Sequence, residues 1–205
     1  MTRLAVSLIV VAAAALAQPN QDNWKPLFDG RTLGEWKKTA FANSPAPRIE
    51  NDSIVLPAGN PLTGITWTGA FPKSDYEIRF EAARQKGGDF FASLTFPVGD
   101  SFATWVLGGW GGDIVGISSI DGWDASDNET RSYAEFETGR WYRFRLRVTA
   151  TRITCWIDDQ SVVNVDISGR EVSLRPGEIK LSTPLGFASY NTTGAIRKLE
   201  YRFLM

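Results

Sequence analysis

Acidic and aromatic side chains gather in one part of the chain, residues 105–131. A carboxylate can act as a general base, an arginine can stabilise a developing oxyanion, and the flat apolar face of an indole can pack on a sugar ring. This combination predicts a site for an oligosaccharide or glycoside. The catalytic candidates are Asp113, Asp121, Asp124, Glu129 and Arg131. The substrate-binding candidates are Trp105, Trp110 and Trp123.

The same segment has two other interpretations. Asp and Asn bond to nearby backbone groups in turns, so the sequence DGWDASDN at 121–128 is also typical of a polar loop between two strands. Its carboxylates are also the hard oxygen ligands that calcium prefers, which makes calcium the candidate cofactor. The spacing is not that of an EF-hand, and the sequence assigns no residue as a metal ligand.

The composition excludes several kinds of chemistry. The chain of 205 residues has no histidine, which excludes histidine-based triads and zinc sites with imidazole ligands. Acid–base chemistry must then come from Asp, Glu, Lys, Tyr or Arg. The single cysteine, Cys155, alternates in phase with Ile153 and Ile157, which predicts a buried thiol. Because 22 basic side chains stand against 23 acidic ones without a basic cluster, no nucleic-acid partner is expected.

The N-terminus has the pattern of a targeting segment. The sequence MTRLAVSLIVVAAAALA has a basic start, an apolar run and a small-residue cleavage signal, which predicts a secretory signal peptide at 1–17. A retained N-terminal anchor is the alternative, although the run is short for a spanning helix. No later segment is apolar enough to span a membrane. We therefore expect a single domain over 18–205, exported to the periplasm or the extracellular space, with its oligomeric state left open.

Period-two alternation of apolar and polar residues dominates the rest of the chain. Runs such as YEIRFEA at 76–82 and WYRFRLRV at 141–148 place apolar side chains on one face and charges on the other. Further strands are expected at 53–56, 64–68, 89–96, 102–108, 113–120, 152–158, 161–167, 178–182, 185–190 and 196–203. About a dozen short antiparallel strands predict an all-β fold, a β-sandwich of jelly-roll type.

A row of arginines lies on the polar face of one expected strand. Arg143, Arg145 and Arg147 alternate with apolar residues, which makes an anion site one interpretation. Glu77, Arg79 and Glu81 have the same spacing on another strand. Cross-strand ion pairs between the two strands are therefore the simpler interpretation.

Three segments resemble a known family. The sequence LFDGRTLGEW at 27–36 resembles the L-F-D-G-x-T-L-x-x-W opening of the 3-keto-disaccharide hydrolase domain family. The segments GRWYRF at 139–144 and GEIKL at 177–181, with the last strand, are similar to later family patterns. The resemblance covers most of residues 24–203 and implies an exported bacterial protein with a concanavalin-like jelly roll. The opening motif itself is expected to form a turn and core anchors.

The resemblance also implies a chemistry. A ketone at C3 of a sugar acidifies the proton on C2, so a base can remove that proton and the group on C1 can leave. Such a site needs a base, a cation or donor for the enolate oxygen, and an acid for the leaving group. The E-x-D-x-E motif of laminarinase-like hydrolases does not occur in this sequence. The two-carboxylate glycosidase route is therefore not expected.

The centre of the chain leaves the function open between three classes. Residues 87–130 depart from the N-S-G-I-x-x-R pattern of the family and carry a glycine–tryptophan hairpin. A hydrolase or lyase acting on 3-keto-glycosides is one hypothesis, and a non-catalytic carbohydrate-binding jelly roll is the alternative. A cell-surface protein-interaction domain is the third, which an exposed apolar patch would favour.

Overall fold

The computed structural model, which describes residues 23–204, consists of two antiparallel sheets. Their strands have the alternation of apolar and polar side chains that the sequence shows. The predicted signal peptide at 1–17 lies outside the described residues. The strands are β1 (Lys25–Pro26), β2 (Trp36–Lys38), β3 (Arg48–Glu50), β4 (Ser53–Leu56), β5 (Leu62–Trp67), β6 (Tyr76–Lys86), β7 (Ser93–Val98), β8 (Ser101–Gly109), β9 (Ile114–Ser118), β10 (Ser132–Tyr133), β11 (Tyr142–Val148), β12 (Arg152–Ile157), β13 (Gln160–Asp166), β14 (Gly186–Tyr190) and β15 (Thr193–Phe203).

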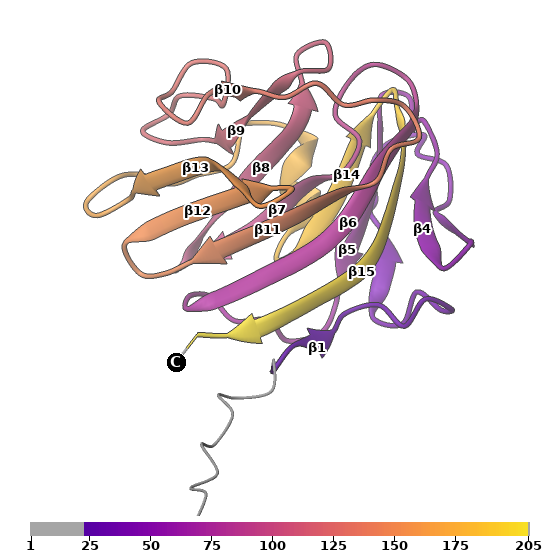
Figure 1. The fold of residues 1–205 in the computed structure, drawn as a ribbon, viewed down its shortest axis with the longest axis horizontal. Helices are drawn as coiled ribbons and strands as arrows, with labels where there is room; N and C mark the ends of the chain where they lie inside the picture. The colour runs from indigo at the N-terminus through magenta and orange to yellow at the C-terminus, as the bar shows by residue number, and fades with distance from the viewer. Residues whose placement is uncertain (1–22, 205) are drawn as a thin grey trace, which may run out of the picture.

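The strands form a sandwich of two layers. Sheet A has the order β13-β12-β11-β6-β15-β4-β3, with β1 also paired to β15, and sheet B has the order β10-β9-β8-β7-β14-β5-β2. Figure 1 shows β12, β11, β6 and β15 side by side in one layer, with β7, β8 and β14 in the layer behind. This architecture confirms the predicted all-β jelly roll. No helix within residues 23–204 has the length and apolar character needed to cross a membrane.

Aromatic rings from both sheets meet between the layers. Phe80 of β6 and Phe144 of β11 stack with their centroids 5.1 Å apart, and Phe187 of β14 packs edge-on against Phe80 at 4.9 Å. Burying each such side chain stabilises the fold by about 1.5–3 kcal/mol. Cys155 is fully buried in the same core, as predicted, and burial raises the pKa of its thiol.

The opening motif stabilises a turn and anchors it to the core. Asp29 accepts hydrogen bonds from the backbone amides of Thr32 and Arg31, both at 2.7 Å, and these bonds lower the pKa of its carboxyl group. Trp36 is fully buried, and its indole donates to the carbonyl oxygen of Leu27 at 2.8 Å. The motif therefore has the structural role that the sequence predicted for it.

One predicted strand is wrong. Residues Glu178–Ser182 form a 3-10 helix, η1, in place of a strand. Gly177 precedes it with φ of 130°, a conformation that favours glycine, and Pro184 follows closely and has no amide to donate to a ladder. The chain between β13 and β14 thus leaves sheet A and packs η1 against β5 and β14 of sheet B.

Candidate functional site

Small side chains form the floor of a hollow on the outer face of sheet B. Because successive residues of a strand point to opposite faces, the core takes Leu94, Trp105 and Ile117, and the residues between them face outward. The outward side chains on the floor are Ser93, Thr104, Val106 and Ser118. The hollow has a volume of about 440 Å³, which is the size of an ordinary small-molecule site.

Three aromatic side chains contribute to the walls of the hollow. Phe90 and Tyr190 lie with their ring centroids 5.7 Å apart, and Trp110 comes from the β8–β9 hairpin. The side chains of Trp110 and Tyr190 are 41% and 38% exposed, so their faces are accessible from solvent. A floor of hydroxyl groups with aromatic walls suits a ligand that has both apolar C–H faces and hydroxyl groups.

Glycines allow the Trp110 hairpin to sit close to a buried arginine. Arg84 of β6 is only 8% exposed, and its Nη2 donates to the carbonyl oxygen of Gly112 at 2.6 Å. A Cβ atom on Gly112 would lie 2.7 Å from the oxygen of Gly88 and 3.0 Å from Nη1 of Arg84. Gly112 is therefore required by close packing, whereas Gly111 has open space around it and is favoured by its φ of 99°. Burial lowers the pKa of the Arg84 guanidinium.

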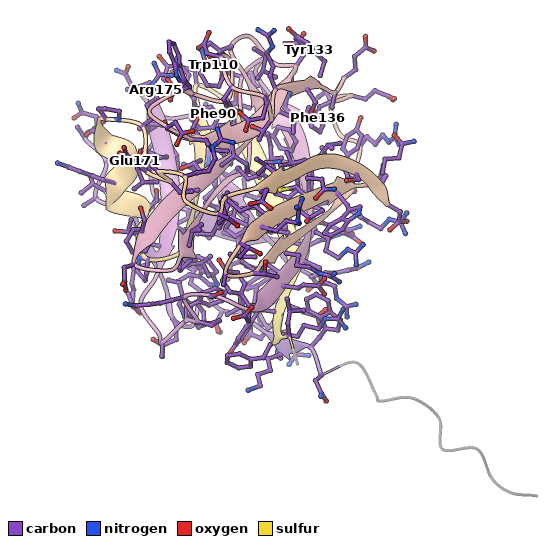
Figure 2. All side chains as sticks on the ribbon, turned by 90° about the vertical axis from the view of Figure 1, so that its left-hand side faces the viewer. Phe90, Trp110, Tyr133, Phe136, Glu171 and Arg175 are labelled. Atoms are coloured by element: carbon purple, nitrogen blue, oxygen red, sulfur yellow. The ribbon has the colours of Figure 1, made fainter. Side chains whose placement is uncertain are left out.

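Arg175 connects the Trp110 hairpin with the acidic turn. Its guanidinium lies 5.5 Å from the centre of the Trp110 ring and 3.3 Å from Oδ2 of Asp124. Asp124 is in turn held by the hydroxyl of Ser119, which donates to its Oδ1 at 3.0 Å. Figure 2 shows Arg175, Trp110 and Phe90 close together near the top of the molecule. Arg175 therefore places a positive charge at the edge of the hollow.

Two carboxylates, Asp89 and Glu178, line the hollow, and they differ in the hydrogen bonds that they accept. Both oxygens of Asp89 accept backbone amides, from Phe90 at 2.8 Å and Gly111 at 3.2 Å, so Asp89 stabilises the hairpin. Glu178 accepts one long hydrogen bond, from the amide of Ala42 at 3.4 Å. Glu178 is therefore the carboxylate with spare capacity to accept a proton from a ligand.

The tryptophan predictions separate into three outcomes. Trp110 lines the hollow, as a substrate-binding residue should. Trp105 is fully buried between the sheets, 5.7 Å from Phe144, so the prediction that it stacks on a ligand is wrong. Its position in β8 points it to the core face, opposite to the floor. Trp123 is 62% exposed on its turn and does not line the hollow.

Most of the predicted acidic residues stabilise loops. Arg170 donates to Asp121 at 2.7 Å and to Glu129, and this pairing holds the pKa of both carboxyl groups below their usual range. Neither carboxylate lines the hollow, and both are engaged by Arg170, so their catalytic role stays a prediction. Arg131 donates to the carbonyl oxygen of Ser126 at 2.9 Å and does not line the hollow.

The remaining two acidic candidates lie outside the hollow as well. Asp113 is exposed at the end of the hairpin, and Asp124 reaches the hollow only through its ion pair with Arg175. Within residues 23–204 no three acidic or cysteine side chains gather in a way that could hold a metal ion. In this segment Arg170 pairs with Asp121 and Glu129, and Arg175 pairs with Asp124, as the turn interpretation allows. Calcium as a cofactor stays a prediction.

The ion pairs of Arg170 with Asp121 and Glu129 predict that the stability of the fold depends on pH. Since the folded-state pKa values of Asp121 and Glu129 are lowered, the pairing stabilises the fold at neutral pH and is lost as the pH falls through them. We expect Arg170→Gln to lower Tm at pH 7, and this difference to shrink as the pH falls below about 4, where free carboxyl groups begin to take up protons. Thermal unfolding of both proteins from pH 7 into this acidic range measures this, and a Tm difference that does not change with pH would contradict it.

Sequence reasoning missed Asp89, Arg175 and Glu178. Glu178 was assigned to a strand, which hid its position on a segment that crosses the outer face of sheet B. The outward serines and threonines of β7 and β8 were a usable signal. Strand positions facing solvent usually carry longer polar side chains, and here they are small and buried, as under a ligand or a covering loop.

An antiparallel sandwich of jelly-roll type is an architecture that lectin domains share with other classes of protein. The chain belongs to the 3-keto-alpha-glucoside-1,2-lyase-like domain family, whose model matches residues 23–200. This confirms the resemblance drawn from the opening motif. No curated protein sequence matches the chain.

Solved structures share the fold at low sequence identity. A structure from Parabacteroides distasonis named as a glycosyl hydrolase has a TM-score of 0.56 at 11% identity, covering 89% of this chain and 94% of that one. The carbohydrate-binding module CBM66 from Bacillus subtilis has a TM-score of 0.50 at 13% identity, with 82% and 95% covered. The carbohydrate recognition domain of Emp47p has a TM-score of 0.56 at 11% identity, with 87% and 93% covered. At these identities the likenesses show the fold alone.

Proposed function

We propose that the chain binds a glycoside in the hollow on sheet B, outside the cytoplasm. The observation that carries this proposal is the hollow itself, with hydroxyl groups on its floor and accessible aromatic rings at Trp110 and Tyr190. Family membership supports a sugar as the ligand. The signal-peptide pattern at 1–17 supports export.

We further propose that a bound 3-keto-glucoside is cleaved between C1 and the glycosidic oxygen. The Glu178 carboxylate takes the proton from C2, and the electron pair of that C–H bond passes to the C3 oxygen as an enolate. Arg175 stabilises this negative charge. The enolate then forms the C1–C2 double bond as the C1–O bond breaks, and the departing oxygen takes a proton from water. Addition of water to the enone completes the hydrolysis.

This mechanism predicts that Glu178→Gln removes cleavage and spares binding. Loss of a general base costs about 10²–10⁴-fold in kcat, whereas the neutral amide keeps the shape of the side chain. Release of p-nitrophenol from p-nitrophenyl 3-keto-α-glucoside measures the cleavage, and calorimetry measures the binding. Glu135→Gln is the matched control, because Glu135 is exposed and does not line the hollow.

A non-catalytic carbohydrate-binding domain is the second candidate function. The limited number of acid–base groups in the hollow favours it, since Asp89 is engaged by two backbone amides and the chain has no histidine. Ligand binding without product release, with and without divalent cations, would support this candidate and overturn the cleavage mechanism. The absence of any glycoside binding would overturn both.

A further inference from the structure

The outer face of sheet A carries a regular grid of charges. Three cross-strand rows run over β11, β6 and β15, and each row contains two arginines and one glutamate. The rows are Arg143–Glu81–Arg197, Arg145–Arg79–Glu200 and Arg147–Glu77–Arg202. Since the grid holds six arginines and three glutamates, this face has an excess of positive charge, although the whole chain has a net charge of −1.

In the two outer rows the charges alternate in sign across the strands, so each arginine has a glutamate as its cross-strand neighbour. Glu77 is fully buried and accepts hydrogen bonds from Arg147 and Arg202, both at 2.7 Å. Glu81 accepts a hydrogen bond from Arg197 at 2.7 Å, and Lys198 donates to its other oxygen. In both rows the glutamate lies on β6 between two arginines. The Arg147–Glu77 contact confirms the pairing that the sequence suggested between these two strands. Glu81 pairs with residues of β15 instead, and Arg143 pairs with Asp158 and Asp159.

The middle row breaks this order. Arg145 lies directly opposite Arg79, so two positive charges face each other across β11 and β6. Like charges in directly opposed positions destabilise a sheet. Arg79 is compensated by Glu200, which accepts its Nε at 2.7 Å. Among the described residues Arg145 has no comparable partner, and the closest carboxylate oxygen there, on Glu77 at 3.8 Å, already accepts a hydrogen bond from Arg147.

Arg145 is nevertheless held in one orientation. Its guanidinium lies over the ring of its cross-strand neighbour Trp156, 4.0 Å from the ring centre. Within residues 23–204 this guanidinium makes no hydrogen bond shorter than 3.5 Å, and the side chain is 36% exposed. A guanidinium lying flat on an indole keeps its N–H donors in its own plane, where they can bind a carboxylate or sulfate in bidentate fashion.

A hollow of about 530 Å³ lies over this part of the grid. Trp24 and Trp156 contribute to its lining, together with Arg143, Arg145 and Lys198. The hollow is on the outer face of sheet A, whereas the glycoside site is on the outer face of sheet B. The two sites therefore lie on opposite faces of the sandwich.

We propose that this hollow binds an anionic polysaccharide, whose carboxylate or sulfate groups pair with Arg145, the arginine that faces Arg79 instead of a glutamate. Arg145 is the central residue of the site. Arg143 and Lys198 lie beside it, each already paired with a carboxylate, Asp159 and Glu81 respectively. The complementary charge of the ligand and the indoles beside the arginines favour a charged sugar polymer on this face. The proposal does not depend on the glycoside site.

Binding of the full chain to three polymers tests this proposal. Polygalacturonate carries carboxylates, dextran sulfate carries sulfates, and dextran is neutral. We expect binding to one or both anionic polymers and not to dextran, and the arm that binds more tightly identifies the preferred group. The affinity should fall as the salt concentration rises, because the contacts are exposed to solvent.

The variant Arg145→Gln separates recognition from stability. Because it removes a charge that faces Arg79, we expect Tm to change by no more than about 2 °C. The affinity for the anionic polymer should fall roughly tenfold or more, as expected for lost hydrogen bonds between charged groups. Arg152→Gln is the matched control, since Arg152 lies at the end of β12, pairs with Asp166 and changes the net charge equally.

Three results would overturn the proposal. The first is that neither anionic polymer binds, and the second is that both variants weaken binding equally, which indicates non-specific attraction. The third is Arg145-dependent binding to vesicles of anionic lipid with none to the polymers. Trp110→Asn should leave polymer binding intact, so failure of the glycoside site and failure of this site are distinguishable.

Discussion

Replacing Trp110 with asparagine is expected to weaken glycoside binding strongly without weakening the fold. Trp110 has φ of 50°, in the left-handed region, where a bulky side chain is strained and asparagine is well tolerated. Asparagine should therefore keep Tm unchanged or raise it slightly. Loss of a central aromatic contact costs about 2 kcal/mol or more, so the affinity should fall roughly thirtyfold or further. Calorimetry with methyl 3-keto-α-glucoside and thermal unfolding measure the two effects.

Trp123→Asn is the control for this experiment. Trp123 is the more exposed of the two indoles, and it lies outside the hollow. Its replacement should leave the affinity unchanged. If Trp110→Asn binds as tightly as the parent chain, Trp110 has only a structural role and the glycoside site must be placed elsewhere.

The strained conformation of Trp110 also supports its role in binding. Glycine or asparagine is the usual residue at a left-handed position in a hairpin, and the neighbouring Gly108, Gly111 and Gly112 also have positive φ. A tryptophan at this position costs stability, and no core contact compensates for it, because the side chain is 41% exposed. Strained residues of this kind are concentrated at functional sites.

The fold could be predicted from local pattern because alternation is a local property. In β11, the apolar residues Tyr142, Phe144 and Leu146 face the core and the arginines between them face outward, as the sequence indicated. The pattern failed at 178–182, where Ile179 and Leu181 alternate with polar residues but find no neighbouring strand. A strand needs a partner as well as a pattern, and the partner is set by the path of the whole chain.

The site was less predictable because its decisive contacts are long-range. Arg170 lies 49 positions from Asp121 and 41 from Glu129 along the chain. Its hydrogen bonds to these two carboxylates stabilise the loop that the sequence suggested as a catalytic cluster. Arg175 reaches Trp110 and Asp124 from the same distant segment. The sequence located one wall of the hollow at Trp110, whereas the carboxylates and the cation beside it depend on where the segment after β13 crosses sheet B.

Replacing Trp105 with alanine is expected to destabilise the fold severely, in contrast to the change at Trp110. Trp105 is fully buried against Phe80 and Phe144, so its removal leaves a large cavity between the sheets. Such substitutions cost about 3–5 kcal/mol, which should lower Tm by roughly 10 °C or more for a domain of this size. Thermal or urea unfolding measures the loss.

Trp105→Phe sharpens the interpretation of that result. The indole nitrogen of Trp105 has no hydrogen-bond partner within the described part of the chain, and a buried unsatisfied donor costs about 1–3 kcal/mol. Phenylalanine keeps an aromatic ring and removes this donor, so we expect a much smaller loss of stability and unchanged glycoside binding. If instead Trp105→Phe removes binding while Tm stays constant, Trp105 contacts the ligand and its assignment to the core is incorrect. The two tryptophans are thus distinguished by what their replacement changes: the stability of the fold for Trp105, and the affinity for the glycoside for Trp110.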